Sequence, residues 1–270
     1  MLLAQITDLH MRRDDTPLSG QLVTRPYTEA AVAAVNAQKP DAVIVTGDLT
    51  DIGTAEEYAL LRSALDGLEA PCFVLPGNHD RREELRAAFH DHAYLPETGP
   101  LQWVVEAFPL RLIGLDSVVP GKGHGEIGAE SLAWLDARLT EDPRPTLVAV
   151  HHPPFPTGIL GMDKIMCLNG AEMAAVIAKH SHVERVIAGH HHRPVQIRWA
   201  RTIGQICPSV AHQVVLDFSD RARPQWVTEP PAFLLHRFAP ETGVISHTAY
   251  IGDYGGAREF KLDPDYPGQS

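Results

Sequence analysis

Short apolar runs alternate with amphipathic stretches over about the first 190 residues, and this alternation limits the fold more than any other feature of the sequence. The apolar runs have the length of buried strands, and the segments between them carry apolar residues at helical spacing. Strands that alternate with helices are typical of an α/β domain with a mostly parallel sheet. The sequence therefore predicts an α/β fold.

The individual elements follow from the same pattern. Strands are expected at residues 2–7, 41–46, 72–75, 103–106, 111–116, 146–150 and 183–188, and helices at 27–38, 54–68, 81–89, 130–139 and from 169 onward. Thr54-x-x-Glu57 is a capping box, and Asn169 is expected to cap the last of these helices. Beyond residue 193 only strands are expected, at 194–200, 202–206, 210–218, 232–238 and 244–251. The last two read as a hairpin, and the polar, proline-rich residues 219–231 as a loop and candidate lid.

The composition and the net charge limit the binding partners and the cellular compartment that are expected for this chain. With 23 basic and 34 acidic residues the net charge is −11, which disfavours long nucleic acid. No apolar run approaches the roughly 18 residues that span a bilayer, so no membrane partner is expected. Three separated cysteines indicate neither a disulfide framework nor a zinc ribbon. Because no signal peptide is recognisable at the N-terminus, we expect a cytoplasmic protein.

Side chains that bind metals follow five of the predicted strands, at the point where each strand ends. They are Asp8 and His10, then Asp48, then Asn78 with His79 and Asp80, then His151, and finally His190 and His192. In an α/β sheet, ligands bind in the crevice at the carboxyl ends of the strands. Each group alone is an ordinary turn or strand end, but their joint occurrence predicts one metal site.

The residue types indicate the metal and the chemistry. Asp, Asn and His suit Mn, Fe, Zn or Co better than a metal that prefers thiolates. Pairs spaced by two, such as Asp8/His10, project the same way from extended backbone and can hold one ion, while the two oxygens of Asp48 can bridge two. Two ions about 3.5–4 Å apart clamp a phosphoryl group and lower the pKa of a bound water. Phosphate esters need such help because they hydrolyse extremely slowly.

The ordered blocks also carry a resemblance. Asp8-x-His10, Gly47-Asp48, Gly77-Asn78-His79-Asp80, His151 and Gly189-His190-x-His192 resemble the signature of the calcineurin-like metallophosphoesterases. His151-His152-Pro153-Pro154, Met162-Asp163, Cys167-x-Asn169-Gly170 and His212-Gln213 are similar to the bacterial class III cyclic-nucleotide phosphodiesterases, most closely to the glycerophosphodiesterases of that branch. The likeness covers residues 1–215 and is loose from about Ser219.

The resemblance implies a four-layer αββα sandwich with residues 1–215 as catalytic core. Residues 216–270 would form C-terminal strands that complete the sheet and a small cap and dimerisation hairpin, so a homodimer or higher homo-oligomer is expected. One ion would be held by Asp8, His10, Asp48 and His192, and the second by Asp48, Asn78, His151 and His190. His79 would contact the phosphate and protonate the leaving alkoxide, Asp80 would orient its ring, and Asn78 and His212 are candidate substrate contacts. His191 would point away from the metals.

The resemblance thus predicts a dinuclear-metal phosphodiesterase that hydrolyses small diesters by attack of a metal-bound hydroxide. Glycerophosphodiesters and 3′,5′-cyclic nucleotides are the candidate substrates, and the sequence does not rank them. A phosphomonoesterase on the same site is the alternative. An interaction scaffold without turnover is less favoured, because all seven ligand residues are present. The sequence also leaves open the native metals, the oligomeric state and the role of the tail.

Overall fold

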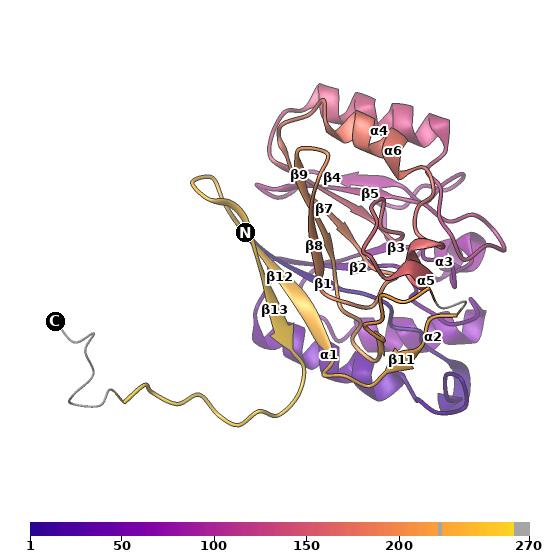
Figure 1. Cartoon of the computed structure of the whole chain (residues 1–270). Coiled ribbons are helices and arrows are strands. Elements are labelled where there is room, and N and C mark those ends of the chain that lie inside the picture. Colours follow the sequence, from indigo (N-terminus) through magenta and orange to yellow (C-terminus); the bar gives the residue numbers. More distant parts are fainter. Residues whose placement is uncertain (221–222, 262–270) are drawn as a thin grey trace.

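Two β-sheets pack face to face at the centre of the molecule, and helices cover the outer face of each (Figure 1). This computed structural model describes residues 1–220 and 223–261. Every element predicted before residue 190 is present, with small differences at the ends. The alternation of apolar and amphipathic segments was therefore a sufficient guide to this part of the chain.

The first sheet has the strand order β13-β12-β1-β2-β3. Its parallel strands are β1 (Leu2–Ile6), β2 (Ala42–Thr46) and β3 (Cys72–Leu75), and β12 (Ala232–Ala239) and β13 (Gly243–Tyr250) extend it antiparallel beyond β1. Its outer face is covered by α1 (Arg25–Ala37), α2 (Ala55–Leu65) and α3 (Arg82–Ala88). The C-terminal hairpin thus completes the same sheet that the N-terminal strand begins.

The second sheet has the order β4-β5-β6-β7-β9-β8. Its strands are β4 (Trp103–Val105), β5 (Arg111–Leu115), β6 (Thr146–Val150), β7 (Val183–Ala188), β8 (Val195–Trp199) and β9 (Thr202–Ile206). Strands β5, β6, β7 and β9 run parallel, and α4 (Ala129–Glu141) and α6 (Gly170–Ile177) cover the outer face. The small elements are a 3₁₀ turn (Arg13–Asp15), α5 (Leu160–Asp163) and the ribbon of β10 (Gln213–Val214) and β11 (Trp226–Val227).

Strand residues alternate between two hydrophobic cores. In β2, Ala42 and Ile44 face the core between the two sheets, whereas Val43 and Val45 face the helices. A third core lies between the second sheet and its helices. A strand buried on both faces must be apolar throughout, which explains the uninterrupted apolar run of β2. The predicted four-layer αββα sandwich is confirmed.

The prediction of a strand over residues 210–218 is wrong in its length. The structure forms a strand only at Gln213–Val214, which pairs with β11. The Ser209 hydroxyl donates to Asp8 O and accepts from the backbone N–H groups of Ala211 and His212, which bends the chain. The predicted loop at 219–231 contains the short strand β11, and its residues 221–222 lie outside the described residues. The turn at Ser209 is what carries His212 toward the carboxyl ends of the strands.

Of the two helix caps predicted from the sequence, one is formed and the other is not. The capping box of Thr54 and Glu57 is present at α2. Asn169 precedes α6 as expected, but its side chain makes no cap bond; it bonds the backbone N–H and C=O of Ile127 instead. Asn169 thereby ties α6 to the loop before α4.

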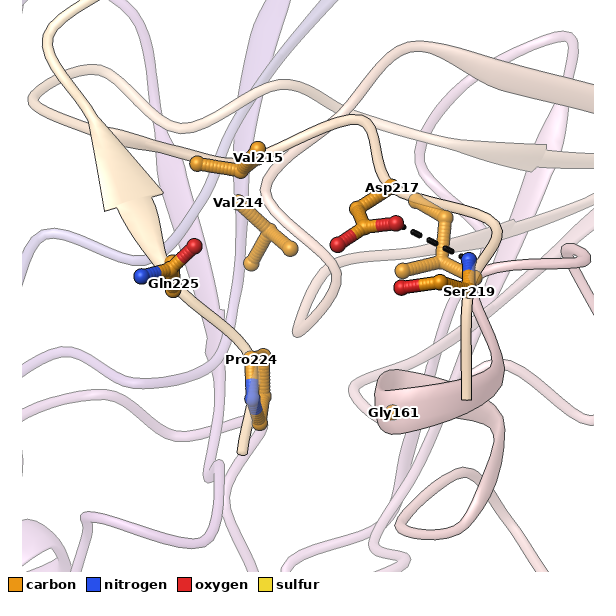
Figure 2. Close-up of a pocket in the computed structure, with 8 residues that line it drawn as sticks. Gly161, Val214, Val215, Asp217, Ser219, Pro224 and Gln225 are labelled. Carbon is orange, nitrogen blue, oxygen red and sulfur yellow. Dashed lines mark hydrogen bonds between the residues drawn. The ribbon is translucent and has the colours of Figure 1, made fainter. Parts of the chain in front are cut away.

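The ribbon of β10 and β11 packs against α5 around a small cavity of about 10 Å³, shown in Figure 2. Val214 and Val215 lie on one side and Gly161 of α5 on the other, and Asp217 accepts a hydrogen bond of 2.9 Å from the backbone N–H of Ser219. This space is about the size of one water molecule. The cavity is therefore a packing gap between the ribbon and α5, and it is too small for an organic substrate.

Candidate metal site

The carboxyl ends of β1, β2 and β3 in the first sheet meet those of β6 and β7 in the second. The residues that follow these strands come together as predicted, and they form two adjoining groups that share Asp48. All of these ligand candidates are buried except Asn78, which is partly exposed. The two sheets together therefore build one polar centre.

The first group consists of Asp8, His10, Asp48 and His192, whose ligand atoms all lie within 4.8 Å of one another. His10 Nε2 is 3.4 Å from His192 Nε2 and 3.7 Å from Asp48 Oδ2. His192 Nε2 is 3.2 Å from Asp8 Oδ1. Two carboxylates and two ring nitrogens aimed at one point suit a cation, which would relieve the repulsion between the carboxylates.

The second group lies on the other side of Asp48. His151 Nε2 is 3.4 Å from Asp48 Oδ1 and 3.2 Å from Asn78 Oδ1, and the His151 and His190 ring centroids are 5.1 Å apart. His152 is also close, with a ligand atom within 4.8 Å of those of His151 and His190. Asp48 therefore turns one oxygen toward each group.

Backbone carbonyls fix the ring protons of three histidines in these groups. A carbonyl only accepts, so in the neutral ring the nitrogen facing it carries the proton and the other nitrogen has the lone pair that a metal can take. The pairs are His151 Nδ1 with Thr46 O at 2.8 Å, His190 Nε2 with Ile165 O at 3.0 Å, and His192 Nδ1 with His212 O at 3.1 Å. The free nitrogens, Nε2 of His151 and His192 and Nδ1 of His190, are thus prepared for a metal.

The polypeptide follows an unusual path at the ligand residues. Positive φ angles occur at Asp8 (55°), His10 (44°), Asp48 (48°), His190 (66°) and His192 (49°). Residues other than glycine rarely adopt this conformation, and it concentrates at functional sites. Five of the seven predicted ligands are therefore held in strained backbone by the surrounding structure.

Two glycines beside the ligands leave no room for a side chain. A Cβ at Gly77 would lie 2.2 Å from Asp48 Oδ1, and one at Gly189 would lie 2.1 Å from Thr7 Oγ1 and 2.9 Å from Asp8 Oδ2. In the motifs Gly77-Asn78 and Gly189-His190, glycine is thus required because the backbone passes directly against a ligand carboxylate.

Burial and charge set the ionisation of the shared carboxylate. Burial raises the pKa of Asp48, but the charges of His151 and His79 outweigh it and hold that pKa well below its usual range. Burial lowers the pKa of His151, but the carboxylate of Asp48 raises it to about 9. Asp48 is thus an anion at neutral pH, ready for a cation.

His79 lies beside this centre with its side chain partly exposed. Its backbone N–H donates to Asp48 Oδ1 at 2.9 Å, and its Nδ1 donates to Asp51 O at 2.8 Å. Asp51 Oδ1 is 3.4 Å from the same ring nitrogen. Burial lowers the pKa of His79, but Asp48 and Asp51 outweigh it and raise the pKa to about 10. The bond to Asp51 O therefore leaves Nε2 as the nitrogen without this partner, and the raised pKa favours the protonated ring.

Asp80 does not take the place expected beside the His79 ring. Its carboxylate accepts hydrogen bonds from the backbone of Leu49, Thr50 and Gly77, from the Thr50 hydroxyl and from the Tyr58 hydroxyl. It holds the loops after β2 and β3 together, and Asp51 is the carboxylate next to the ring. The sequence reasoning missed Asp51, although an Asp three residues after Asp48 was an available signal.

Three further histidines surround the site. The His212 ring lies 4.5 Å from that of His192 and 5.4 Å from that of His10, and 5.6 Å from the Trp226 ring of the ribbon. His191 is fully buried, and its ring nitrogens have no hydrogen-bond partner within residues 1–220 and 223–261. His152 Nδ1 lies 2.8 Å from Ser117 Oγ. Of these, His212 is placed to reach a ligand bound at His10 and His192.

A four-layer αββα sandwich whose Asp, Asn and His donors come from both sheets defines a metal-dependent phosphoesterase. The family model "Calcineurin-like phosphoesterase" matches residues 1–194. The chain belongs to this family, and all the predicted ligands fall within the matched range.

The proteins that resemble the chain include two curated relatives and one solved structure. A probable glycerophosphodiester phosphodiesterase of Arcobacter nitrofigilis is 36% identical and covers 96% of this chain and 97% of its own. The 3′,5′-cyclic adenosine monophosphate phosphodiesterase of Escherichia coli K12 is 31% identical, with 73% of this chain and 71% of its own covered. A dimetal phosphatase of Danio rerio shares the fold, with a TM-score of 0.62 at 13% identity over 93% of this chain and 99% of that one.

No helix in the described part of the chain is both long and apolar enough to cross a membrane.

The likeness to the Arcobacter relative extends through the C-terminal strands, because it covers nearly the whole chain. The likeness to the Escherichia coli enzyme leaves about a quarter of the chain uncovered. The family model itself ends at residue 194, before the C-terminal strands.

Proposed function

We propose that the chain hydrolyses small phosphodiesters at a centre of two metal ions. The observation that carries this proposal is the position of Asp48, whose Oδ2 lies 3.7 Å from His10 Nε2 and whose Oδ1 lies 3.4 Å from His151 Nε2. A carboxylate whose two oxygens face two separate donor groups is suited to bridge two cations. The names of the relatives, glycerophosphodiester and cyclic-nucleotide phosphodiesterases, support the reaction class.

Each ion would have its own donors besides Asp48. Asp8, His10 and His192 would complete the first position, and Asn78, His151 and His190 the second. His151 rather than His152 is proposed as a ligand, because Thr46 O fixes its proton on Nδ1 and aims Nε2 at Asp48 and Asn78. Oxygen and nitrogen donors alone are consistent with Fe, Mn, Zn or Co.

The chain's own groups would bind the diester and move the proton. When bound, such ions supply an activated water and neutralise charge on the phosphoryl oxygens. His79, protonated and anchored through Nδ1 to Asp51 O, would donate the Nε2 proton to the leaving alkoxide. His212 would contact the substrate beside His10 and His192. Asn78 would hold both a metal and the phosphate.

The test is a substrate panel on metal-reconstituted protein, with cyclic AMP and glycerophosphoethanolamine compared side by side. We expect turnover of at least one of them, and of bis-p-nitrophenyl phosphate faster than mono-p-nitrophenyl phosphate. His79→Ala should lose most turnover of the alkyl diester while keeping its circular dichroism spectrum and its metal content. A faster monoester reaction would replace the proposal with the phosphomonoesterase, and folded, metal-loaded protein without turnover would favour a scaffold.

The C-terminal strands are proposed as a cap and a contact between subunits. β13 is the edge strand of the first sheet, and it exposes Ile245 and Tyr250. An exposed edge strand with apolar residues favours pairing with another chain. We therefore propose a homodimer or larger homo-oligomer, with residues 1–215 as the catalytic part. A molar mass of one chain by light scattering would contradict it. The three free cysteines fit a cytoplasmic location.

A further inference from the structure

A pocket of about 590 Å³ opens directly from the metal site on the side of His79. It is lined by Asn78 and His79 of the site, by Arg81 and Glu84 at the start of α3, and by Val118 and Pro120 from the loop after β5. A volume of this size holds a small organic group. The pocket therefore adjoins the reacting atoms and has room for one substituent of the phosphate.

Which substituent enters this pocket follows from the position of the acid, and this step rests on the proposed function. A group that protonates a leaving oxygen must lie within hydrogen-bond reach of it. His79 forms the pocket wall, and its Nδ1 is already bonded to Asp51 O, so Nε2 is the nitrogen available to the substrate. The leaving alcohol is therefore the part of the diester that extends into the pocket.

The charges along the pocket are not equally available to a ligand. The Arg82 guanidinium bonds Asp116 at 2.6 and 2.9 Å and Val118 O at 2.6 Å, so its donors are largely used. Among the carboxylates of the described residues, Arg81 forms an ion pair only with Glu84, at 4.0 Å, and its side chain is 57% exposed. Arg81 is thus the cation at the pocket that a ligand can still engage.

The stem of Arg81 is held in place. Its Cγ lies against Gly53, where an added Cβ would approach it to 2.6 Å, and its backbone N–H donates to the Tyr58 hydroxyl at 3.2 Å. Gly53 has a φ of +77°, a conformation that favours glycine. The backbone and Cγ of Arg81 are therefore held in position, and its guanidinium lies at the pocket that His79 also lines.

We propose that Arg81 binds an anionic substituent on the leaving alcohol, so that the enzyme prefers diesters whose leaving group carries a carboxylate. The matched probes are glycerophosphoserine and glycerophosphoethanolamine, which differ only by that carboxylate. In the reaction of the first, water adds to phosphorus, the bond from phosphorus to the serine oxygen breaks, and that oxygen takes the proton from His79. The products are glycerol 3-phosphate and serine.

The experiment measures kcat/KM for both diesters and identifies the products with metal-reconstituted full-length protein. We expect glycerophosphoserine to be favoured by about threefold to fivefold, the size of an exposed ion pair, and to yield serine. Arg81→Gln should remove that preference. Glu84→Gln is the matched control, because it neutralises the neighbouring charge but retains Arg81, and it should keep the preference.

Two outcomes would overturn the assignment. One is a wild-type enzyme with equal kcat/KM for the two diesters, and the other is an Arg81→Gln enzyme with the wild-type ratio. Release of glycerol and phosphoserine would also overturn it, because glycerol would then occupy the pocket. Failure of the proposed function looks different, since the wild-type protein would then hydrolyse none of the diesters, bis-p-nitrophenyl phosphate included.

Discussion

His79 and Asp51 are joined twice: the ring Nδ1 donates to the Asp51 carbonyl at 2.8 Å, and the Asp51 carboxylate lies 3.4 Å from the same nitrogen. The carboxylate also lies 3.4 Å from His10 Nδ1 and bonds Arg12 at 2.8 Å. One loop residue after β2 therefore contacts both a predicted metal ligand and the predicted acid.

These contacts predict that Asp51→Asn lowers the turnover of alkyl diesters more than the turnover of bis-p-nitrophenyl phosphate. The substitution removes the negative charge that favours the protonated His79 ring but keeps the carbonyl bond. Turnover of an alkyl diester, whose leaving group needs a proton, should fall by about tenfold or more. Turnover of bis-p-nitrophenyl phosphate should fall much less, because p-nitrophenolate leaves without one. Equal losses on both substrates, measured at saturating metal, would contradict this role.

Removal of the carboxylate of Asp48, which both metal positions share, should weaken metal binding at both positions. Asp48→Asn should bind less metal by elemental analysis and lose activity by about 10²–10³-fold, the scale of losing one strong electrostatic contact in a transition state. In the wild-type protein, added metal should raise the melting temperature, because a ligand that binds only the folded state stabilises it. A variant that keeps full metal content would argue against a bridging Asp48.

Gly77→Ala should damage the site although it adds only a methyl group. The new Cβ would lie 2.2 Å from Asp48 Oδ1 and 2.3 Å from Asp48 N, so the loop must shift. We expect a loss of about 2 kcal/mol in the free energy of unfolding, together with weaker metal binding. Gly123→Ala is the control, since its nearest neighbour would be Ile165 Cγ2 at 3.9 Å. Similar chemical denaturation midpoints for the two variants would refute the explanation.

The metal-free protein should lose stability as the pH rises above neutral. The folded-state pKa values of His151 and His79 are raised to about 9 and about 10 by Asp48 and its neighbours, against about 6.5 in the unfolded chain. Their contribution is therefore fully present below pH 6.5 and is lost as the pH rises through 9 to 10. Thermal melts of chelator-treated protein should show this decline, and His151→Gln should reduce it. A flat profile from pH 7 to 10 would count against these raised values.

The local pattern of the sequence predicted the α/β fold and the polar residues at the strand ends, whereas the four-layer arrangement was implied by the resemblance to the family. Apolar runs such as Val43–Val45 identify strands and therefore the polar residues at their carboxyl ends. The same pattern suggested one edge of a single sheet, which is wrong, because the donors come from two sheets. Asp51 and the turn at Ser209 were not predicted, because their partners, His79 and Asp8, are distant in sequence. The resemblance implied that Asp80 orients the His79 ring, but the Asp80 carboxylate faces the loop of Leu49 and Thr50. The left-handed backbone of the ligands is likewise set by tertiary contacts.

Because Asp8, His10 and Asp48 follow strands of one sheet while His151, His190 and His192 follow strands of the other, neither half of the sandwich possesses a working centre. Catalytic competence can only arise once the halves have docked in register. A folded variant of the buried inter-sheet interface, far from any ligand, is therefore expected to lose turnover when the substitution shifts one half against the other. The activity of the enzyme therefore depends on the correct packing of its two halves.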